Sequence, residues 1–66
     1  MENAVKTLRK SAGWSQQDMA EQLGISRQSI ISIERGRYDP SLDLAIRIAR
    51  IFEKPVQDIF FPEDKS

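Results

Sequence analysis

The chain has 66 residues, no cysteine and no histidine, and its 10 basic and 10 acidic residues give a formal net charge of zero. A chain this short is expected to form a single domain that gains stability from a partner subunit. Without thiol or imidazole groups, a disulfide framework is excluded, and no enzyme, cofactor or metal site is expected. No apolar run approaches a signal core or a membrane span, which predicts a soluble, cytoplasmic protein.

The charges are unevenly distributed along the chain. Residues 1–38 carry six basic and four acidic side chains, whereas residues 39–66 carry four basic and six acidic ones. The first part is therefore +2 and the second −2. Because this asymmetry is mild, any polyanionic partner must be met by the local placement of Arg and Lys.

Start and stop signals of helices recur along the chain and predict five short helices with no sheet. The first helix is expected over about residues 3–12, where apolar side chains recur at helical spacing. Gly13 follows it directly and suits a left-handed cap.

The next two predicted helices share one pattern of signals. Ser15 precedes the second helix and Ser26 the third, and each hydroxyl is an N-cap candidate. Only Gly24 and Ile25 separate the end of one helix from the cap of the next. So short a connection forces the helices to cross steeply, which predicts a helix-turn-helix over about residues 16–35.

The C-terminal part is predicted to hold two more helices. Ser41 is the N-cap candidate of the fourth, which should run through about Phe52. The inward stripe expected for this helix consists of Leu42, Ala45, Ile48, Ala49 and Phe52. Pro55 opens a last short helix, and Pro62 ends it.

Five linked motifs follow one another in the order SQQDMA, the Gly24 turn, SRQSI, IERG and DPSLDLAIRIA. Together they resemble the Cro/C1-type helix-turn-helix family, also called the xenobiotic-response-element family, of bacterial and phage transcription regulators. The resemblance covers roughly residues 3–60. It implies an all-α, compact five-helix, phage-repressor-like domain over residues 1–66, with a double-stranded DNA operator as its partner.

The resemblance also implies which side chains meet DNA. In such a family the second helix of the motif lies in the major groove, and its first residues reach base edges. The base-reading candidates at matching positions are Arg27, Gln28, Ser29 and Ser32. The candidates for contact with the DNA backbone are Ser15, Gln16, Arg35, Arg37 and Tyr38. Amide and guanidinium groups suit base reading because they form paired hydrogen bonds with adenine and guanine.

The resemblance also leads to expectations for an ion pair and for one unusual apolar residue. Arg9 and Glu34 resemble a pair that in relatives forms a mostly buried salt bridge between the first helix and the recognition helix. Ile31 stands where relatives commonly have a small or polar residue, and it lies about 100° around the helix from Ile30. Two interpretations of Ile31 stay open, which are contact with a thymine methyl group and packing on the loop around Tyr38.

Apolar residues of the C-terminal part favour a homodimer, with residues 41–66 as the dimerisation region. Some lie off the inward stripe of the fourth helix, and others follow the last helix with no second domain to cover them. The interface candidates are Ile46, Ile51, Phe60 and Phe61. The simpler alternative is an irregular small core that absorbs part of them.

Together, these expectations predict a transcriptional repressor that binds a near-palindromic operator as a homodimer. The alternatives within DNA binding are an antitoxin and a controller of restriction-modification genes. A further alternative is a protein-interaction module that has lost DNA binding, which the zero net charge favours. Since the chain offers no effector domain, a regulatory protein partner is one expected source of control.

Overall fold

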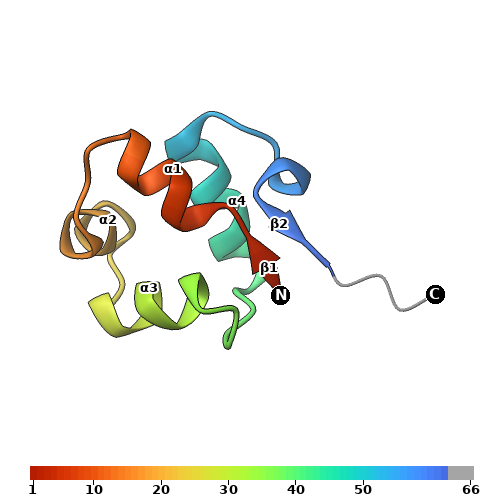
Figure 1. Ribbon diagram of the computed structural model, residues 1–66, viewed down its shortest axis with the longest axis horizontal. Coiled ribbons are helices and arrows are strands. Elements are labelled where there is room, and N and C mark those ends of the chain that lie inside the picture. Colours follow the sequence, from red (N-terminus) through yellow and green to blue (C-terminus); the bar gives the residue numbers. More distant parts are fainter. Residues whose placement is uncertain (63–66) are drawn as a thin grey trace.

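The computed structural model describes residues 1–62 and is mainly helical (Figure 1). Its four α-helices are α1 (Val5–Ser11), α2 (Gln16–Leu23), α3 (Arg27–Glu34) and α4 (Leu42–Phe52). Its remaining elements are β1 (Glu2–Asn3), one 3₁₀ turn, η1 (Val56–Asp58), and β2 (Phe60–Phe61). The expected helical class is confirmed, whereas the expectation of five helices without a sheet is wrong. No helix in residues 1–62 is long and apolar enough to cross a membrane.

The two strands bring the beginning and the end of the described chain together. They pair antiparallel, with Glu2 opposite Phe61 and Asn3 opposite Phe60. The segment after Pro55 is too short to nucleate a stable α-helix without support, so it makes one 3₁₀ turn and then extends. Pairing with β1 satisfies backbone groups that a fifth helix would otherwise have satisfied internally.

Serine caps begin three of the four α-helices. The Ser15 hydroxyl accepts the Asp18 N–H at 3.0 Å, and the Asp18 carboxylate accepts the Ser15 N–H at 2.9 Å, which completes a capping box. Ser26 caps α3 and Ser41 caps α4 in the same way, through the N–H groups three residues later. The predicted caps are therefore confirmed.

One apolar core lies among the helices and the C-terminal segment. Its buried members are Val5, Met19, Ala20, Leu23, Ile30, Ile33, Leu44, Ala45, Ile48, Ala49, Ile59 and Phe60. Phe60 is only 6% exposed, because the pairing of β2 with β1 turns this side chain inward. The assignment of Phe60 to an exposed dimer interface is therefore wrong for the folded chain.

The inward stripe of α4 also differs from the prediction at its first residue. Leu44 is 8% exposed and belongs to the core, whereas Leu42 is 72% exposed. Two residues of helix separate their directions by about 160°, so one of them must face outward when the other is buried. Leu42 therefore begins an exposed apolar flank of α4.

Candidate nucleic-acid interface

The turn between α2 and α3 is fixed by local and tertiary hydrogen bonds. Gly24 has a φ of 69°, and the Ile25 N–H reaches the Ala20 carbonyl at 3.0 Å, as in a Schellman motif. The guanidinium of Arg47, from α4, donates to the carbonyl of Leu23. The end of α2 is thus fixed both by its own turn and by α4, and α3 begins at Arg27, three residues after Gly24.

A buried polar cluster ties α3 to α1 and to the start of α2. Arg9 Nε donates to Glu34 Oε2 at 2.6 Å, and Arg9 Nη2 donates to Glu34 Oε1 at 3.3 Å. The two side chains are only 8% and 5% exposed. Arg9 Nη1 also donates to the carbonyl of Trp14 at 2.9 Å. Since both charges are paired and hydrogen-bonded, the cluster fixes how α3 is oriented on the domain.

Gln16 belongs to the same cluster. Its amide nitrogen donates to Glu34 Oε1 at 3.2 Å, so the side chain points toward the end of α3. Gln16 also lines a surface hollow together with Ser15 and Arg27. The structure therefore gives Gln16 an internal partner that the sequence interpretation did not include, while keeping it beside the first residue of α3.

The outward side of α3 is defined by what the helix buries. Ile30 and Ile33 are fully buried, so the opposite side of α3 faces away from the core. Arg27 and Gln28 are exposed, and Ser32 is half-buried one helical turn after Gln28. Three of the four base-reading candidates are thus brought together on this outward side.

Ser29 is placed differently from the other three candidates. It precedes buried Ile33 by four residues, which puts it toward the core side of the helix. Its hydroxyl lies 2.9 Å from the Ser26 hydroxyl, inside the N-cap. The Ser29 hydroxyl is therefore already hydrogen-bonded to the hydroxyl that caps α3.

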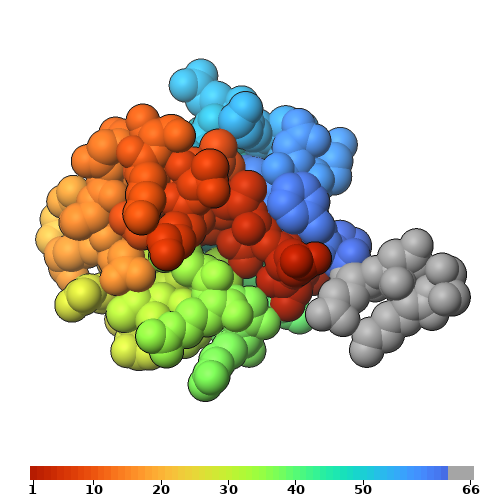
Figure 2. All heavy atoms as spheres, viewed as in Figure 1, coloured from red at the N-terminus to blue at the C-terminus, as the bar shows by residue number. Residues whose placement is uncertain are grey.

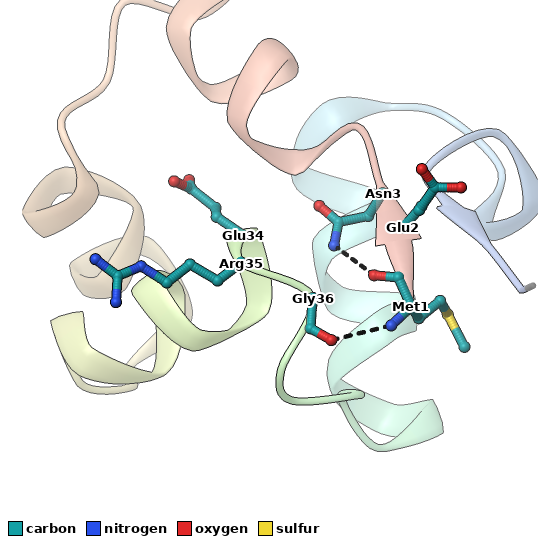
Figure 3. A pocket seen from close by; sticks show the side chains of 6 residues that line it. All are labelled: Met1, Glu2, Asn3, Glu34, Arg35 and Gly36. Carbon is teal, nitrogen blue, oxygen red and sulfur yellow. Dashed lines mark hydrogen bonds between the residues drawn. The ribbon is translucent and has the colours of Figure 1, made fainter.

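The loop after α3 is held by the N-terminal strand (Figure 3). Asn3 Nδ2 donates to the carbonyl of Ile33 at 2.8 Å and to that of Met1 at 3.3 Å. The Met1 ammonium donates to the carbonyl of Gly36 at 3.0 Å. Gly36 has a φ of 74°, and a Cβ there would lie 3.0 Å from the Met1 carbonyl oxygen. Glycine is thus required both by the backbone conformation and by this close approach.

Basic side chains surround the outward side of α3. Arg35 and Arg37 are exposed at its end, and Tyr38 is 46% exposed in the loop that follows. Lys6, from α1, lines the same hollow as Arg27 and Arg35. The sequence interpretation missed Lys6, although its positive charge in the first helix was a visible signal. The buried ion pair neutralises Glu34, so these residues leave the face positively charged.

Comparisons with known proteins agree with this architecture. A family model described as Helix-turn-helix matches residues 5–59. An uncharacterized HTH-type transcriptional regulator of Methanocaldococcus jannaschii is 50% identical over 64 residues, which cover 97% of each chain. The HTH-type transcriptional regulator YgzD of Bacillus subtilis is 41% identical over 66 residues, which cover all of both chains.

Two solved structures resemble the chain in fold and, more weakly, in sequence. The restriction-modification controller protein C.AhdI from Aeromonas hydrophila gives a TM-score of 0.75 at 27% identity over 85% of each chain. A hypothetical transcription factor from Neisseria gives a TM-score of 0.74 at 26% identity, covering 82% of this chain and 61% of that one. The chain therefore belongs to the Cro/C1-type helix-turn-helix family of DNA-binding transcriptional regulators.

Proposed function

We propose that this regulator represses transcription by binding a near-palindromic operator as a homodimer and blocking access of the polymerase. The observation that carries the proposal is the orientation of α3, which the Arg9–Glu34 cluster holds with its polar side turned away from the core. Exposed guanidinium and amide groups on a fixed helix suit the major groove. Such a protein would act in the cytoplasm, at the nucleoid.

The side chains divide into two roles by position and chemistry. Gln28 suits a paired contact with adenine and Arg27 one with guanine, while Ser32 offers a less selective hydroxyl. The proposed contacts with the DNA backbone are Ser15, Gln16, Arg35, Arg37 and Tyr38. Ser15 and Gln16 line a hollow with Arg27, and Arg35, Arg37 and Tyr38 are exposed after the last turn of α3. Contacts of these groups with phosphates would position the helix without reading sequence. Ser29 remains a candidate only if its hydroxyl leaves the cap.

The dimer is proposed to form through an apolar surface, which we define as Leu42, Ile46 and Phe61. Their exposed fractions are 72%, 38% and 42%. Leu42 also lines an apolar groove together with Val56 and Phe60. Exposed large apolar side chains on so small a domain favour association, and a second copy supplies a matching surface by two-fold symmetry.

Ile51 does not fit the same interface. It follows Ile46 by five residues, which places it about 140° around α4. Ile51 is half-buried and packs against the core. We therefore propose an interface that keeps Ile46 and Phe61, adds Leu42, and omits Ile51. Residues 63–66 of the proposed dimerisation region lie outside the described residues.

The arrangement of the elements is compatible with a dimer that reads two half-sites. In Figure 1, α3 lies along the lower edge and β2 along the right-hand edge. A second copy docked beside β2 would leave the outward side of α3 uncovered. Two recognition helices related by a two-fold axis read half-sites about 34 to 36 Å apart, which is one turn of DNA.

The test is selection of bound duplexes from a random DNA pool, followed by binding measurements at two salt concentrations. We expect a near-palindromic motif and an affinity that falls steeply with salt, because bound phosphates release counterions. No binding at low salt would contradict the function. A recovered motif without two-fold symmetry, together with only 7.6 kDa species in sedimentation equilibrium, would contradict the dimer.

A second candidate is control of restriction-modification genes. The observation in its favour is the similarity to C.AhdI, which extends over 85% of both chains. This role uses the same dimer and the same DNA-reading side chains, so it differs only in the genes beside the operator. Mapping bound sites on the genome distinguishes it from general repression, because a controller would occupy a promoter next to restriction and modification genes.

A further inference from the structure

Ile31 is an apolar side chain on the outward half of α3, and it is not part of the core. Other half-buried large apolar side chains pack against the core in residues 1–62, namely Met1, Leu8, Trp14, Ile25, Ile51, Phe52 and Val56. Ile31 is half-buried as well but does not belong to this group. A β-branched residue also brings no gain in helix propensity over Gln, Arg or Ala. Neither core packing nor helix propensity accounts for Ile31.

The surroundings of Ile31 are charged. It lines a hollow whose other lining residues are Lys6, Gln16, Arg27, Glu34 and Arg35. Arg27 precedes Ile31 by four residues and Arg35 follows it by four, so both flank it on the helix. Figure 3 shows the Arg35 side chain running back along α3, and Figure 2 shows α1 lying against α3 on one face of the molecule. Ile31 is therefore an apolar side chain with basic side chains around it, and we call Lys6, Arg27 and Arg35 the positive rim of this hollow.

The loop around Tyr38 does not form this hollow. Tyr38 is 46% exposed and is not among the residues that line it. The chain turns away after α3, where the Arg37 N–H bonds to the carbonyl of Ser32 at 3.1 Å. Packing of Ile31 on this loop is therefore not favoured over contact with an external group.

We propose that Ile31 is a specificity-determining residue that contacts the C5-methyl group of a pyrimidine in the major groove. This methyl group is the apolar group that the groove presents on thymine, and 5-methylcytosine carries the same group. Duplex DNA also places phosphates on both sides of the groove, which matches the positive rim formed by Lys6, Arg27 and Arg35. The inference rests on the proposed function and specifies one contact within it.

The test uses the operator recovered by selection. In one half-site, each thymine is replaced in turn by deoxyuridine, and each cytosine by 5-methylcytosine. Fluorescence anisotropy then gives dissociation constants for the parent, Ile31→Ala and Ile31→Val. We expect one position at which the methyl group strengthens binding of the parent by about 4-fold, the value for burying one methyl-sized group. The series in which this position occurs identifies thymine or 5-methylcytosine as the source.

The variants decide whether residue 31 is responsible. Ile31→Ala should bind equally with and without that methyl group, while Ile31→Val should keep part of the effect. Ser32→Ala is the matched control on the same helix and should keep the full effect. Thermal unfolding verifies that each variant is folded. If Ile31→Ala does not fold, the smaller change Ile31→Val still tests whether residue 31 contacts the methyl group.

Two results would overturn the inference. One is a recovered operator at which no pyrimidine methyl group alters the affinity of the parent. The other is an Ile31→Ala variant that keeps the parent's sensitivity to the methyl group. Both leave the proposed function intact, whereas a selection that returns no sequence overturns the function and this inference with it.

Discussion

The outward side of α3 and the apolar surface of α4 and β2 are both uncovered in the single chain, but they are built on different supports. α3 is held by a buried ion pair with α1 and by a hydrogen bond from Gln16 of α2, and these hydrogen bonds are directional. The apolar surface lies on α4 and β2, where most of the support comes from apolar packing, with the Arg47–Leu23 hydrogen bond behind α4 and one two-residue strand pair at β2. A helix that reads bases must keep its orientation, whereas an apolar surface tolerates adjustment against a partner.

The largest expected effect comes from breaking the buried cluster under α3. Glu34→Ala leaves the Arg9 guanidinium buried beside a cavity, because both hydrogen bonds to the carboxylate are lost. We expect the free energy of unfolding to fall by about 3 to 5 kcal/mol, measured by urea denaturation.

A double variant is the control for this effect. Arg9→Met combined with Glu34→Leu removes both charges, so the loss should be clearly smaller than for Glu34→Ala alone. DNA affinity of the double variant should still decrease, because an apolar pair does not fix the orientation of α3. A Glu34→Ala protein as stable as the parent would show that the cluster contributes little.

Leu42→Ala tests the role of the apolar surface in forming the dimer. We expect the dimer dissociation constant in sedimentation equilibrium to rise about 10-fold to 100-fold, since a fully buried Leu side chain contributes about 1.5 to 3 kcal/mol. Stability of the single chain should change little, because Leu42 is 72% exposed. Ile51→Ala is the matched control and should leave the dimer constant unchanged. An equal effect of both variants would place the interface elsewhere on α4.

Gln28→Ala and Arg37→Ala separate reading of bases from contact with phosphates. Gln28→Ala should cost about 1 to 3 kcal/mol of affinity for the selected operator and relax the preference at one base position. Arg37→Ala should weaken binding to all sequences alike and reduce the slope of log affinity against log salt by about one. Parent-like binding by Gln28→Ala would refute the proposed orientation of α3 in the groove.

Asn3→Ala tests the contact that links the two regions and should have the smallest effect. Asn3 pairs with β2 through its backbone and with the end of α3 through its side chain. Losing the 2.8 Å hydrogen bond to the Ile33 carbonyl should cost about 1 kcal/mol in thermal unfolding. Glu2→Gln, on the same strand, is the control and should change stability by less than about 0.5 kcal/mol. If the two substitutions change stability equally, the hydrogen bond from the Asn3 side chain does not contribute to stability.

The sequence predicted those parts of the fold that depend on neighbouring residues. Ser15, Ser26 and Ser41 cap their helices because a hydroxyl reaches an N–H group only three residues away. The turn at Gly24 follows equally from a local requirement for positive φ. The resemblance to the family paired Arg9 with Glu34, which stand 25 residues apart and which no local signal connects.

Only the tertiary structure decided the arrangement of the C-terminal segment and the details of the site. The pairing of Asn3 with Phe60 joins residues from opposite ends of the described chain, so no local propensity indicates it. That pairing replaces the fifth helix and buries Phe60. The position of the core likewise selects Leu44 over Leu42 for the inward side of α4. Capping and turn signals act over one helical turn and are present in the sequence, whereas burial depends on which surfaces meet once the chain has folded.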